Sequence, residues 1–160
     1  MDLKFSSVAA TPSNPNWNNL ISRKDELYKK TNDVRSEFER DYDRILYCNA
    51  YRRLKHKTQV FFLPKNDHIC TRIEHVNNVD ATSYTIAKAL GLNTTLTRAI
   101  SISHDIGHSP FGHKGEQILN QICLEHNLEP FWHERNGLNF VDNIELLTNV
   151  NNEEKKLNLT

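Results

Sequence analysis

The amino-acid sequence predicts an all-α protein. Apolar residues recur at helical spacing in several separate stretches, only one short piece has the composition of extended chain, and residues 22–57 contain neither Gly nor Pro. With 160 residues, the chain has the length of one domain with a modest core. Each expected element follows from its own local pattern.

The N-terminal third is polar at first and then strongly helical. Residues 1–20 are rich in Asn, Pro and Ser and predict a flexible segment. From Ser22 to about Lys57, charged sequence with apolar residues at helical spacing predicts a helix. Residues 58–63 predict a short extended piece, because β-branched and aromatic residues there precede Pro64 and a polar turn.

The remaining two thirds predict a series of shorter helices. One helix is expected to begin near Asp67 and end near Leu90, with a core face made of Val76, Val79, Ile86 and Leu90. The tripeptide "GLN" at 91–93 would end this helix and cap the next one, whose apolar face is Leu96, Ala99, Ile100 and Ser103. Two more helices are expected over residues 111–126 and 133–147.

Composition excludes several classes of protein. Lys plus Arg and Asp plus Glu both number 20, so net charge gives no argument for a polyanionic partner. The three cysteines lack CxxC spacing, which favours a reducing compartment and argues against a cysteine zinc site. The longest apolar run is "VFFL", too short for a membrane helix, and the N-terminus has no apolar signal core. We therefore expect a cytoplasmic protein without a membrane partner.

The segment "HDIGHSPFGHKGE", residues 104–116, concentrates three of the eight histidines with two carboxylates. The adjacent His104 and Asp105 stand at the expected end of a helix, where both side chains can bind one metal ion. His75, on the preceding helix, is the best candidate for a third ligand. Imidazole and carboxylate suit Mn²⁺, Fe²⁺, Zn²⁺ and, less well, Mg²⁺. Taken singly, each of these residues is more often an ordinary polar side chain than a ligand.

Longer motifs resemble a known family. "RRLKHKTQVFFLPKNDHICTRIEHVNNV" (52–79), "ISISHDIGHSPFGHKGEQILN" (100–120), "FWHERNGLNFVD" (131–142) and "LNLT" (157–160) are similar to segments of the HD-domain dNTP triphosphohydrolases of the dGTPase type. The resemblance extends from about Arg35 to the last residue. It implies an HD-domain helical bundle and an enzyme that hydrolyses a deoxynucleoside triphosphate, typically dGTP, to the deoxynucleoside and triphosphate.

The resemblance also implies roles for individual residues. The metal ligands would be His75, His104 and Asp105, and the catalytic dyad would be His113 and Glu116. Because His113 and Glu116 are three positions apart on a helix, they share a face, and the carboxylate can orient the imidazole for proton transfer.

Further residues match the family's active site. His133 and Glu134 resemble a second catalytic pair. Arg72 matches an arginine that contacts the substrate phosphates, and a forked guanidinium suits that task. His108 would line the phosphate pocket. Gln59 matches a glutamine near the deoxyribose, although an amide that caps a loop is nearly as good an interpretation.

The resemblance suggests a divalent cofactor, Mn²⁺ or Mg²⁺, with Fe²⁺ or Zn²⁺ as alternatives. It also suggests a homo-oligomer at full length. The basic stretch "YRRLKHK" at 51–57 is interpreted as a solvated or subunit-facing surface, although some family members respond to single-stranded DNA. Nothing else in the sequence supports a nucleic-acid partner.

One expected ligand is missing. The family's fourth metal ligand is an aspartate well downstream, but after Asp105 this chain contains only Asp142, which matches a non-ligand position. We therefore expect residues 21–160 to be the N-terminal part of one HD phosphohydrolase domain, following a flexible segment at 1–20. The chain alone should show weak or no hydrolysis. Two alternatives stay open: another HD-type nucleotide phosphohydrolase, or a catalytically silent HD module that senses nucleotides or completes an oligomer.

Overall fold

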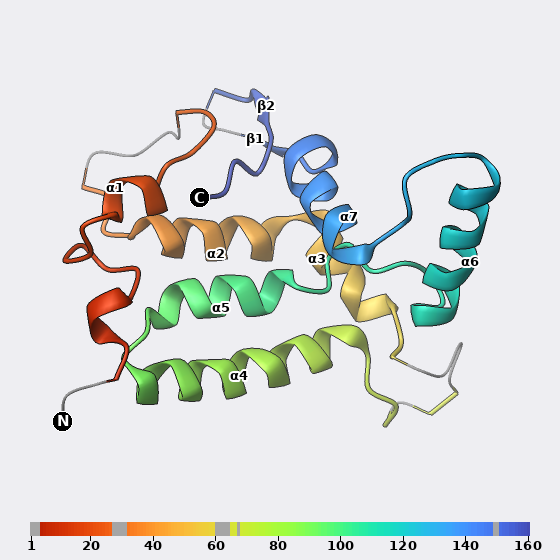
Figure 1. The fold of residues 1–160 in the computed structure, drawn as a ribbon, viewed down its shortest axis with the longest axis horizontal. Coiled ribbons are helices and arrows are strands. Elements are labelled where there is room, and N and C mark those ends of the chain that lie inside the picture. Colours follow the sequence, from red (N-terminus) through yellow and green to blue (C-terminus); the bar gives the residue numbers. More distant parts are fainter. Residues whose placement is uncertain (1–3, 27–31, 60–64, 67, 149–150) are drawn as a thin grey trace.

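The computed structural model describes residues 4–26, 32–59, 65–66, 68–148 and 151–160, and the described chain is mainly helical (Figure 1). This confirms the predicted fold class. In chain order the elements are η1 (Ser6–Val8), α1 (Trp17–Leu20), α2 (Glu37–Tyr47), α3 (Asn49–Arg53), η2 (Leu54–His56), α4 (Arg72–Leu90), α5 (Thr94–Ser103), α6 (Gly112–Glu125), α7 (His133–Asn139), the π-helical turn η3 (Phe140–Ile144), β1 (Leu147–Thr148) and β2 (Glu154–Lys155). None of the described helices is long and apolar enough to cross a membrane.

Helices α4 and α5 form the hairpin that positions the site. Helix α4 begins with a capping box in which Thr71 and Glu74 bond each other's backbone N–H. It ends at Gly91, whose φ of 76° is the left-handed conformation that glycine adopts without strain. The Asn93 side chain then accepts the N–H of Leu96 at 2.9 Å and starts α5. The predicted "GLN" turn is confirmed, and α2 packs beside α5 (Figure 1).

The single helix predicted for residues 22–57 is wrong. Helix α2 begins only at Glu37, after a capping box between Ser36 and Glu39. Cys48 takes an extended conformation, with ψ of 151°, and ends α2. Its sulfur accepts the backbone N–H of Tyr51, so the same residue caps the start of α3.

A buried carboxylate stabilises the start of α3 after this break between the helices. The side chain of Glu145 is only 5% exposed and accepts the N–H groups of Asn49 at 2.8 Å and Ala50 at 2.7 Å. Because α3 begins at these residues, the carboxylate caps its N-terminus and meets the positive end of its dipole.

The same residue ends the last helical segment. The helix predicted for 133–147 stops at Ile144, because Glu145 is extended and turns its side chain toward α3. The chain then forms the antiparallel pair β1–β2, a hairpin that the sequence analysis did not predict. The extended piece predicted for 58–63 lies mostly outside the described residues, but Thr58 forms an isolated antiparallel bridge with Thr71.

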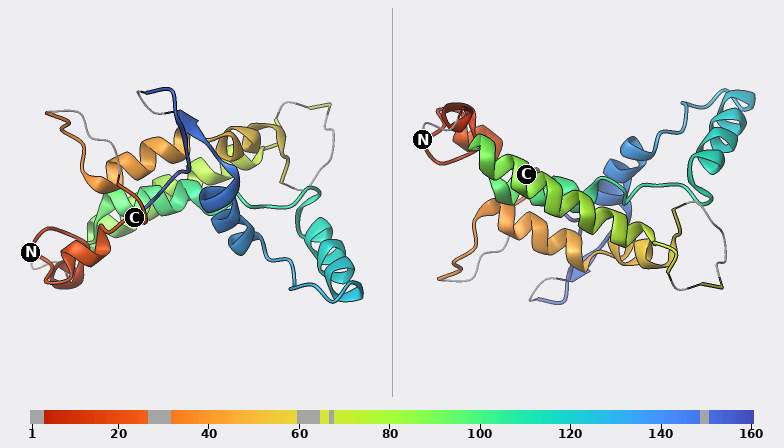
Figure 2. Two further views of the ribbon diagram at one scale, coloured as in Figure 1. Left: turned by 90° about the horizontal axis from the view of Figure 1, so that it is seen from above. Right: turned by 90° about the horizontal axis from the view of Figure 1, so that it is seen from below.

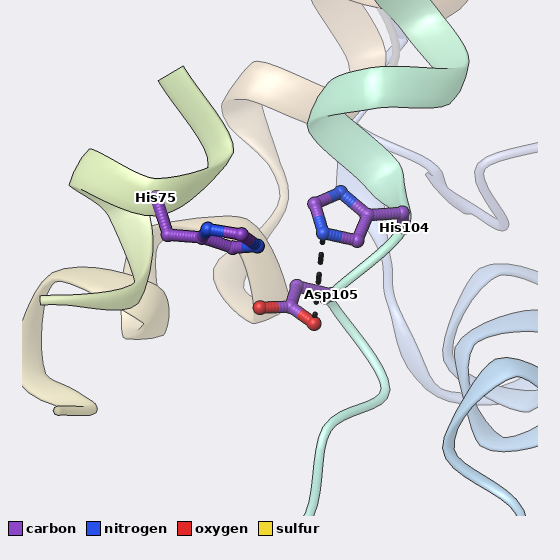
Figure 3. A group of neighbouring side chains, drawn as sticks. All are labelled: His75, His104 and Asp105. Carbon is purple, nitrogen blue, oxygen red and sulfur yellow. Dashed lines mark ion pairs between the residues drawn. The ribbon is translucent and has the colours of Figure 1, made fainter. Parts of the chain in front are cut away.

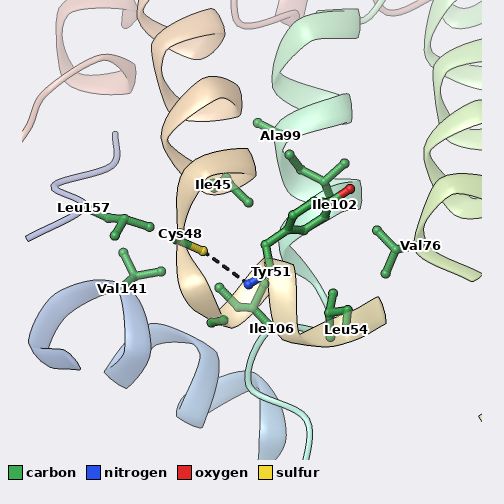
Figure 4. Packing of buried hydrophobic residues seen from close by; sticks show 11 residues of the cluster. Ile45, Cys48, Tyr51, Leu54, Val76, Ala99, Ile102, Ile106, Val141 and Leu157 are labelled. Atoms are coloured by element: carbon green, nitrogen blue, oxygen red, sulfur yellow. Dashed lines mark hydrogen bonds between the residues drawn. The ribbon is translucent and has the colours of Figure 1, made fainter. Parts of the chain in front are cut away.

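The core lies where α2, α3, α4 and α5 meet the C-terminal segment, and Figure 4 shows its packing. The buried apolar residues are Ile45, Cys48, Ala50, Tyr51, Leu54, Val76, Ala99, Ile102, Ile106, Val141 and Leu157. The core face predicted for α4 is partly wrong, because Ile86 is 53% exposed and Ala87 is buried instead. The helix is rotated so that Asp80 faces Arg98 of α5, with an Nη2–Oδ2 distance of 3.0 Å.

Two peripheral parts complete the molecule. Residues 4–20 contact the main bundle, since Phe5 donates its N–H to the Leu90 carbonyl and Trp17 packs edge-on against Phe38. The predicted flexibility of residues 1–20 stays a prediction. Helix α6 projects away from the α2–α4–α5 layer on two connecting loops (Figures 1 and 2).

Candidate active site

His75, His104 and Asp105 converge at the ends of two helices (Figure 3). His75 stands in the first turns of α4, and the other two follow the last turn of α5. One donor atom from each residue lies within 4.8 Å of the other two. Donor atoms around an ion with bonds of about 2.0–2.2 Å lie roughly 3–4 Å apart. The three side chains therefore need only small rotations to share one ion.

The imidazole of His104 is oriented for ligation. Its Nδ1 donates to the carbonyl of Ser101 at 2.7 Å, which leaves the lone pair of Nε2 free. Nε2 lies 3.8 Å from Oδ1 of Asp105, and the ring lies edge-on to that of His75 with centroids 5.5 Å apart. A backbone acceptor that fixes the tautomer is the arrangement typical of metal-ligating histidines.

Asp105 is held as a carboxylate by Arg72. Both side chains are buried, and Nη1 of Arg72 donates to Oδ2 of Asp105 at 2.9 Å. Burial alone would raise the pKa of Asp105, but the charge and the hydrogen bond of Arg72 outweigh it and keep the pKa below its usual range. Arg72, predicted to contact substrate phosphates, is thus already engaged with a predicted ligand.

A second acid–base pair joins α6 to α7. Oε1 of Glu116 accepts both Nδ1 of His133 at 2.9 Å and the backbone N–H of His133 at 3.0 Å. Burial alone would raise the pKa of Glu116, but the bonds from His133 outweigh burial and keep that pKa below its usual range. The other predicted partner, His113, lies 3.6 Å from Oε2 of Glu116 and its side chain is 81% exposed. Glu116 therefore binds His133 more closely than His113.

His108 lies between the two groups. It is 4% exposed, its Nδ1 donates to the Ser109 carbonyl at 3.1 Å, and its ring centroid is 5.1 Å from that of His133. Burial lowers the pKa of His108, and the positive charge of Arg72 lowers it further. The buried His108 side chain therefore lies beside the predicted metal ligands with a pKa below its usual range.

Lys57 joins the two segments that carry the site. Its carbonyl accepts the N–H of Arg72, and its Nζ donates to the carbonyl of His108, both at 2.8 Å. Gln59 follows two residues later, and its carbonyl would lie 3.7 Å from a Cβ placed on Gly112. The segment with the predicted deoxyribose contact therefore borders the turn at Gly112.

The turn after Asp105 packs closely against α7. A Cβ on Gly107 would lie 2.1 Å from the backbone nitrogen of Gly137 and 2.2 Å from the carbonyl oxygen of His133, so only glycine fits. The Asn136 side chain donates to the Gly107 carbonyl at 2.8 Å. This contact places the start of α7, and with it His133, beside the segment that carries the metal ligands.

A cavity of about 710 Å³ opens beside the metal ligands. Its wall includes all four residues of the apolar face predicted for α5, Leu96, Ala99, Ile100 and Ser103, together with His104 and Glu134. Ile100 is 58% exposed, whereas Ala99 of the same face is buried in the core. Asp142 also lines the cavity, where its Oδ2 pairs with Nζ of Lys24 at 2.5 Å. Asp142 does not belong to either candidate metal group of the described residues.

The structure thus brings His75, His104 and Asp105 into one group, and Glu116, His133 and Glu134 into another. Sequence reasoning missed the residues that support these groups. The backbone acceptor at Ser101 and the contact of Gly107 with α7 leave no signal in the residue types. Lys57 could have been suspected, because it lies two residues before Gln59 in the motif of residues 52–79.

The HD domain model matches residues 72–158, which is more than half of the chain. The chain belongs to the HD domain family. Among its relatives is a "Deoxyguanosinetriphosphate triphosphohydrolase-like protein" of Caldanaerobacter subterraneus subsp. tengcongensis, 45% identical over 128 residues, which are 80% of this chain and 35% of the relative.

Two further relatives carry the same name. The protein of Desulfatibacillum aliphaticivorans is 50% identical over 112 residues, covering 70% of this chain and 31% of the relative. The protein of Bartonella quintana is 39% identical over 145 residues, covering 91% of this chain and 35% of the relative. The resemblance inferred from the sequence is confirmed, and the chain spans about a third of the length of the curated relatives it matches.

Proposed function

We propose that the chain carries the metal-binding and proton-transferring part of a phosphohydrolase that converts a deoxynucleoside triphosphate, dGTP first among them, to the deoxynucleoside and triphosphate. The observation that carries the proposal is the convergence of His75, His104 and Asp105 at the start of "HDIGHSPFGHKGE". The printed names of the relatives support the substrate.

The donor set fits a divalent cation, for which Mn²⁺ or Mg²⁺ is proposed, with Fe²⁺ or Zn²⁺ as alternatives. Two imidazoles and an ionised carboxylate are available, and the tautomer of His104 leaves its Nε2 free. An ion bound there would polarise a phosphate oxygen and lower the pKa of a bound water.

The residues around the donor set have separate tasks in this proposal. Glu116 orients His133, so that His133 can take or deliver the proton at the reacting oxygen. His113, which is exposed and lies 3.6 Å from Oε2 of Glu116, is proposed as the second catalytic histidine beside that carboxylate. Arg72 keeps Asp105 ionised and borders Gly112, where its Nη2 would lie 3.6 Å from an added Cβ. We propose that the substrate phosphates lie at this turn, within reach of the guanidinium.

The substrate contacts are proposed on the same surface. Gln59 would contact the deoxyribose, and His108 would line the phosphate pocket. Glu134 completes the proton-handling group, since its Oε1 lies 3.2 Å from Nε2 of His133. The homo-oligomer expected of the full-length protein belongs to the proposal as well.

The product pair tests the proposal. The chain, at high concentration with Mn²⁺, would be incubated with a substoichiometric amount of dGTP, and the products separated by ion exchange. Slow release of deoxyguanosine and triphosphate, lost in Asp105→Asn, is the expected result. Release of dGMP and diphosphate would instead identify another HD-type nucleotide hydrolase.

A complete lack of dGTP hydrolysis would be interpreted from whether the chain binds dGTP. Together with Mn²⁺-dependent binding of dGTP by calorimetry, it would support a silent nucleotide-sensing module or the expected inactivity of this part of the protein. Without such binding, the proposed substrate would be refuted. Rapid turnover by residues 1–160 would refute the expectation that the chain alone is weakly active.

A further inference from the structure

Lys57 links the segment before α4 to the turn after α5. Its carbonyl accepts the N–H of Arg72, and its Nζ donates to the carbonyl of His108, both at 2.8 Å. We propose that Lys57 is a positioning residue, whose bond to His108 sets the distance between His75 on α4 and the two metal ligands that follow α5. The inference rests on the proposed function, in which these three ligands share one metal ion.

The backbone of Lys57 is anchored to the start of α4. The next residue, Thr58, forms an antiparallel bridge with Thr71, the N-cap of α4. Arg72 is the first residue of the helix, so the N–H that it donates to Lys57 has no partner inside the helix. His75 lies less than one turn further along. Lys57 therefore keeps a fixed position relative to His75.

The side chain of Lys57 reaches the other half of the site. His108, whose carbonyl it bonds, donates its own N–H to the carbonyl of Asp105 at 3.1 Å and so closes a turn. A bond from Lys57 to this turn holds the backbone of Asp105 against α4. The ion pair of Arg72 with Asp105 occupies a carboxylate oxygen of the ligand. The bond of Lys57 uses a backbone carbonyl instead and leaves every ligand atom available.

The donor at this position is charged. Two other carbonyls near the turn accept hydrogen bonds from uncharged side chains, those of Asn136 and Ser109. The carbonyl of His108 accepts from an ammonium group, and a bond from a charged donor is roughly twice as strong as a neutral one. Burial lowers the pKa of Lys57, and the charges of two neighbouring arginines lower it further. The strong bond to His108 therefore offsets an electrostatic cost.

The charge and the hydrogen bond of Lys57 have opposite effects on metal affinity. Lys57 lies within electrostatic range of Asp105, so removal of its positive charge alone should strengthen the binding of a dication there. Loss of the bond to His108 would let the turn move, and loss of such support for metal ligands lowers metal affinity by about 10–100-fold. The sign of the change therefore separates the two effects.

The test compares Lys57→Met with the parent chain. Methionine keeps a side chain of similar length but donates no hydrogen bond. Mn²⁺ affinity, measured by electron paramagnetic resonance of the free ion, should decrease about tenfold. Exchange of the His108 backbone amide, followed by NMR, should become about tenfold faster, whereas exchange in α4 and α5 should stay slow. The matched control is Lys55→Met, which removes an exposed lysine two positions away and should change neither quantity.

Several results would overturn the inference. One is a Mn²⁺ affinity in Lys57→Met that equals or exceeds that of the parent. Another is faster exchange by the same factor throughout the chain, which would indicate general destabilisation. Lys57→Arg keeps a charged donor and should retain slow exchange of the His108 amide, so a loss as large as in Lys57→Met would also contradict the inference.

Failure of the proposed function would look different. If the parent chain binds no Mn²⁺, the proposed metal is refuted, while unchanged exchange of the His108 amide in Lys57→Met refutes the role of Lys57 with or without metal. Absence of dGTP turnover would refute the proposed substrate and would alter neither measurement.

Discussion

Replacing Gly107 by Ala should push α7 away from the segment that carries the metal ligands. The added Cβ would lie 2.1 Å from the backbone nitrogen of Gly137 and 2.2 Å from the carbonyl oxygen of His133. Unstrained contacts of this kind are about 3.5 Å long, so the backbone must separate by roughly 1 Å or more. Backbone atoms on both sides leave no flexible side chain to absorb this shift.

The cost follows from two terms. Overpacking of this type destabilises by about 1–3 kcal/mol, and the loss of the Asn136 bond to the Gly107 carbonyl adds about 1 kcal/mol. We expect a total near 3 kcal/mol by urea unfolding, followed by circular dichroism. For a chain of this size, that corresponds to a decrease of roughly 6–12 °C in Tm.

Gly137→Ala is the matched control on the opposite side of the contact. Its Cβ would lie no closer than 3.7 Å to Gly107 and Ile106, which is ordinary van der Waals contact. Alanine is favoured over glycine in a helix by up to about 1 kcal/mol, so this variant should be as stable as the parent or slightly more so. A Gly107→Ala protein within about 0.5 kcal/mol of the parent would refute the described packing of α7.

Three further perturbations probe other contacts. Glu145→Ala should destabilise the protein by about 2–4 kcal/mol in urea unfolding, because two backbone N–H groups lose a charged acceptor. Iodoacetamide should modify exposed Cys70 and spare Cys48 until the protein unfolds, since burial raises the pKa of the Cys48 thiol to about 11. The free energy of unfolding should decrease as the pH is lowered below about 5. The reason is that Arg72 keeps the pKa of Asp105 lower in the folded chain than in the unfolded chain. In Asp105→Asn the stability at neutral pH should be lower and its acid dependence weaker.

Each result has a clear contrary outcome. Equal stability of Glu145→Ala and the parent would mean that the carboxylate does not cap α3. Equal labelling rates of the two cysteines, read by peptide mass spectrometry, would contradict the burial of Cys48. An unchanged acid dependence in Asp105→Asn would show that the ion pair with Arg72 is not the source of the titration.

Local patterns predicted the parts of the molecule that are set by neighbouring residues. The turn at 91–93 depends on a left-handed Gly91 and a capping Asn93, and both leave direct signals in the sequence. The adjacent His104 and Asp105 were predicted for the same reason, because the end of α5 places them together. His75 was found because this short turn brings α4 back beside α5.

Contacts across long stretches of sequence could not be predicted in this way. Glu145 ends one helix because its carboxylate caps another that begins 96 residues earlier, a pairing that no periodicity encodes. The hairpin β1–β2 begins at Leu147, just after Glu145 has left the helical conformation. In α4, Asp80 pairs with Arg98 of α5 and Ile86 is exposed, whereas apolar spacing alone predicted that Ile86 would join Val76 in the core.

The ion pair between Arg72 and Asp105 also determines how the site responds to anions. The guanidinium cancels the one negative charge of the donor set, since His75 and His104 are neutral when they ligate. A dication added there would leave an excess of two positive charges in a partly buried place, next to Lys57. A polyanion would relieve that excess, so metal and polyanion should each increase the other's affinity by the same factor. Titration of Mn²⁺ with and without tripolyphosphate measures this coupling directly.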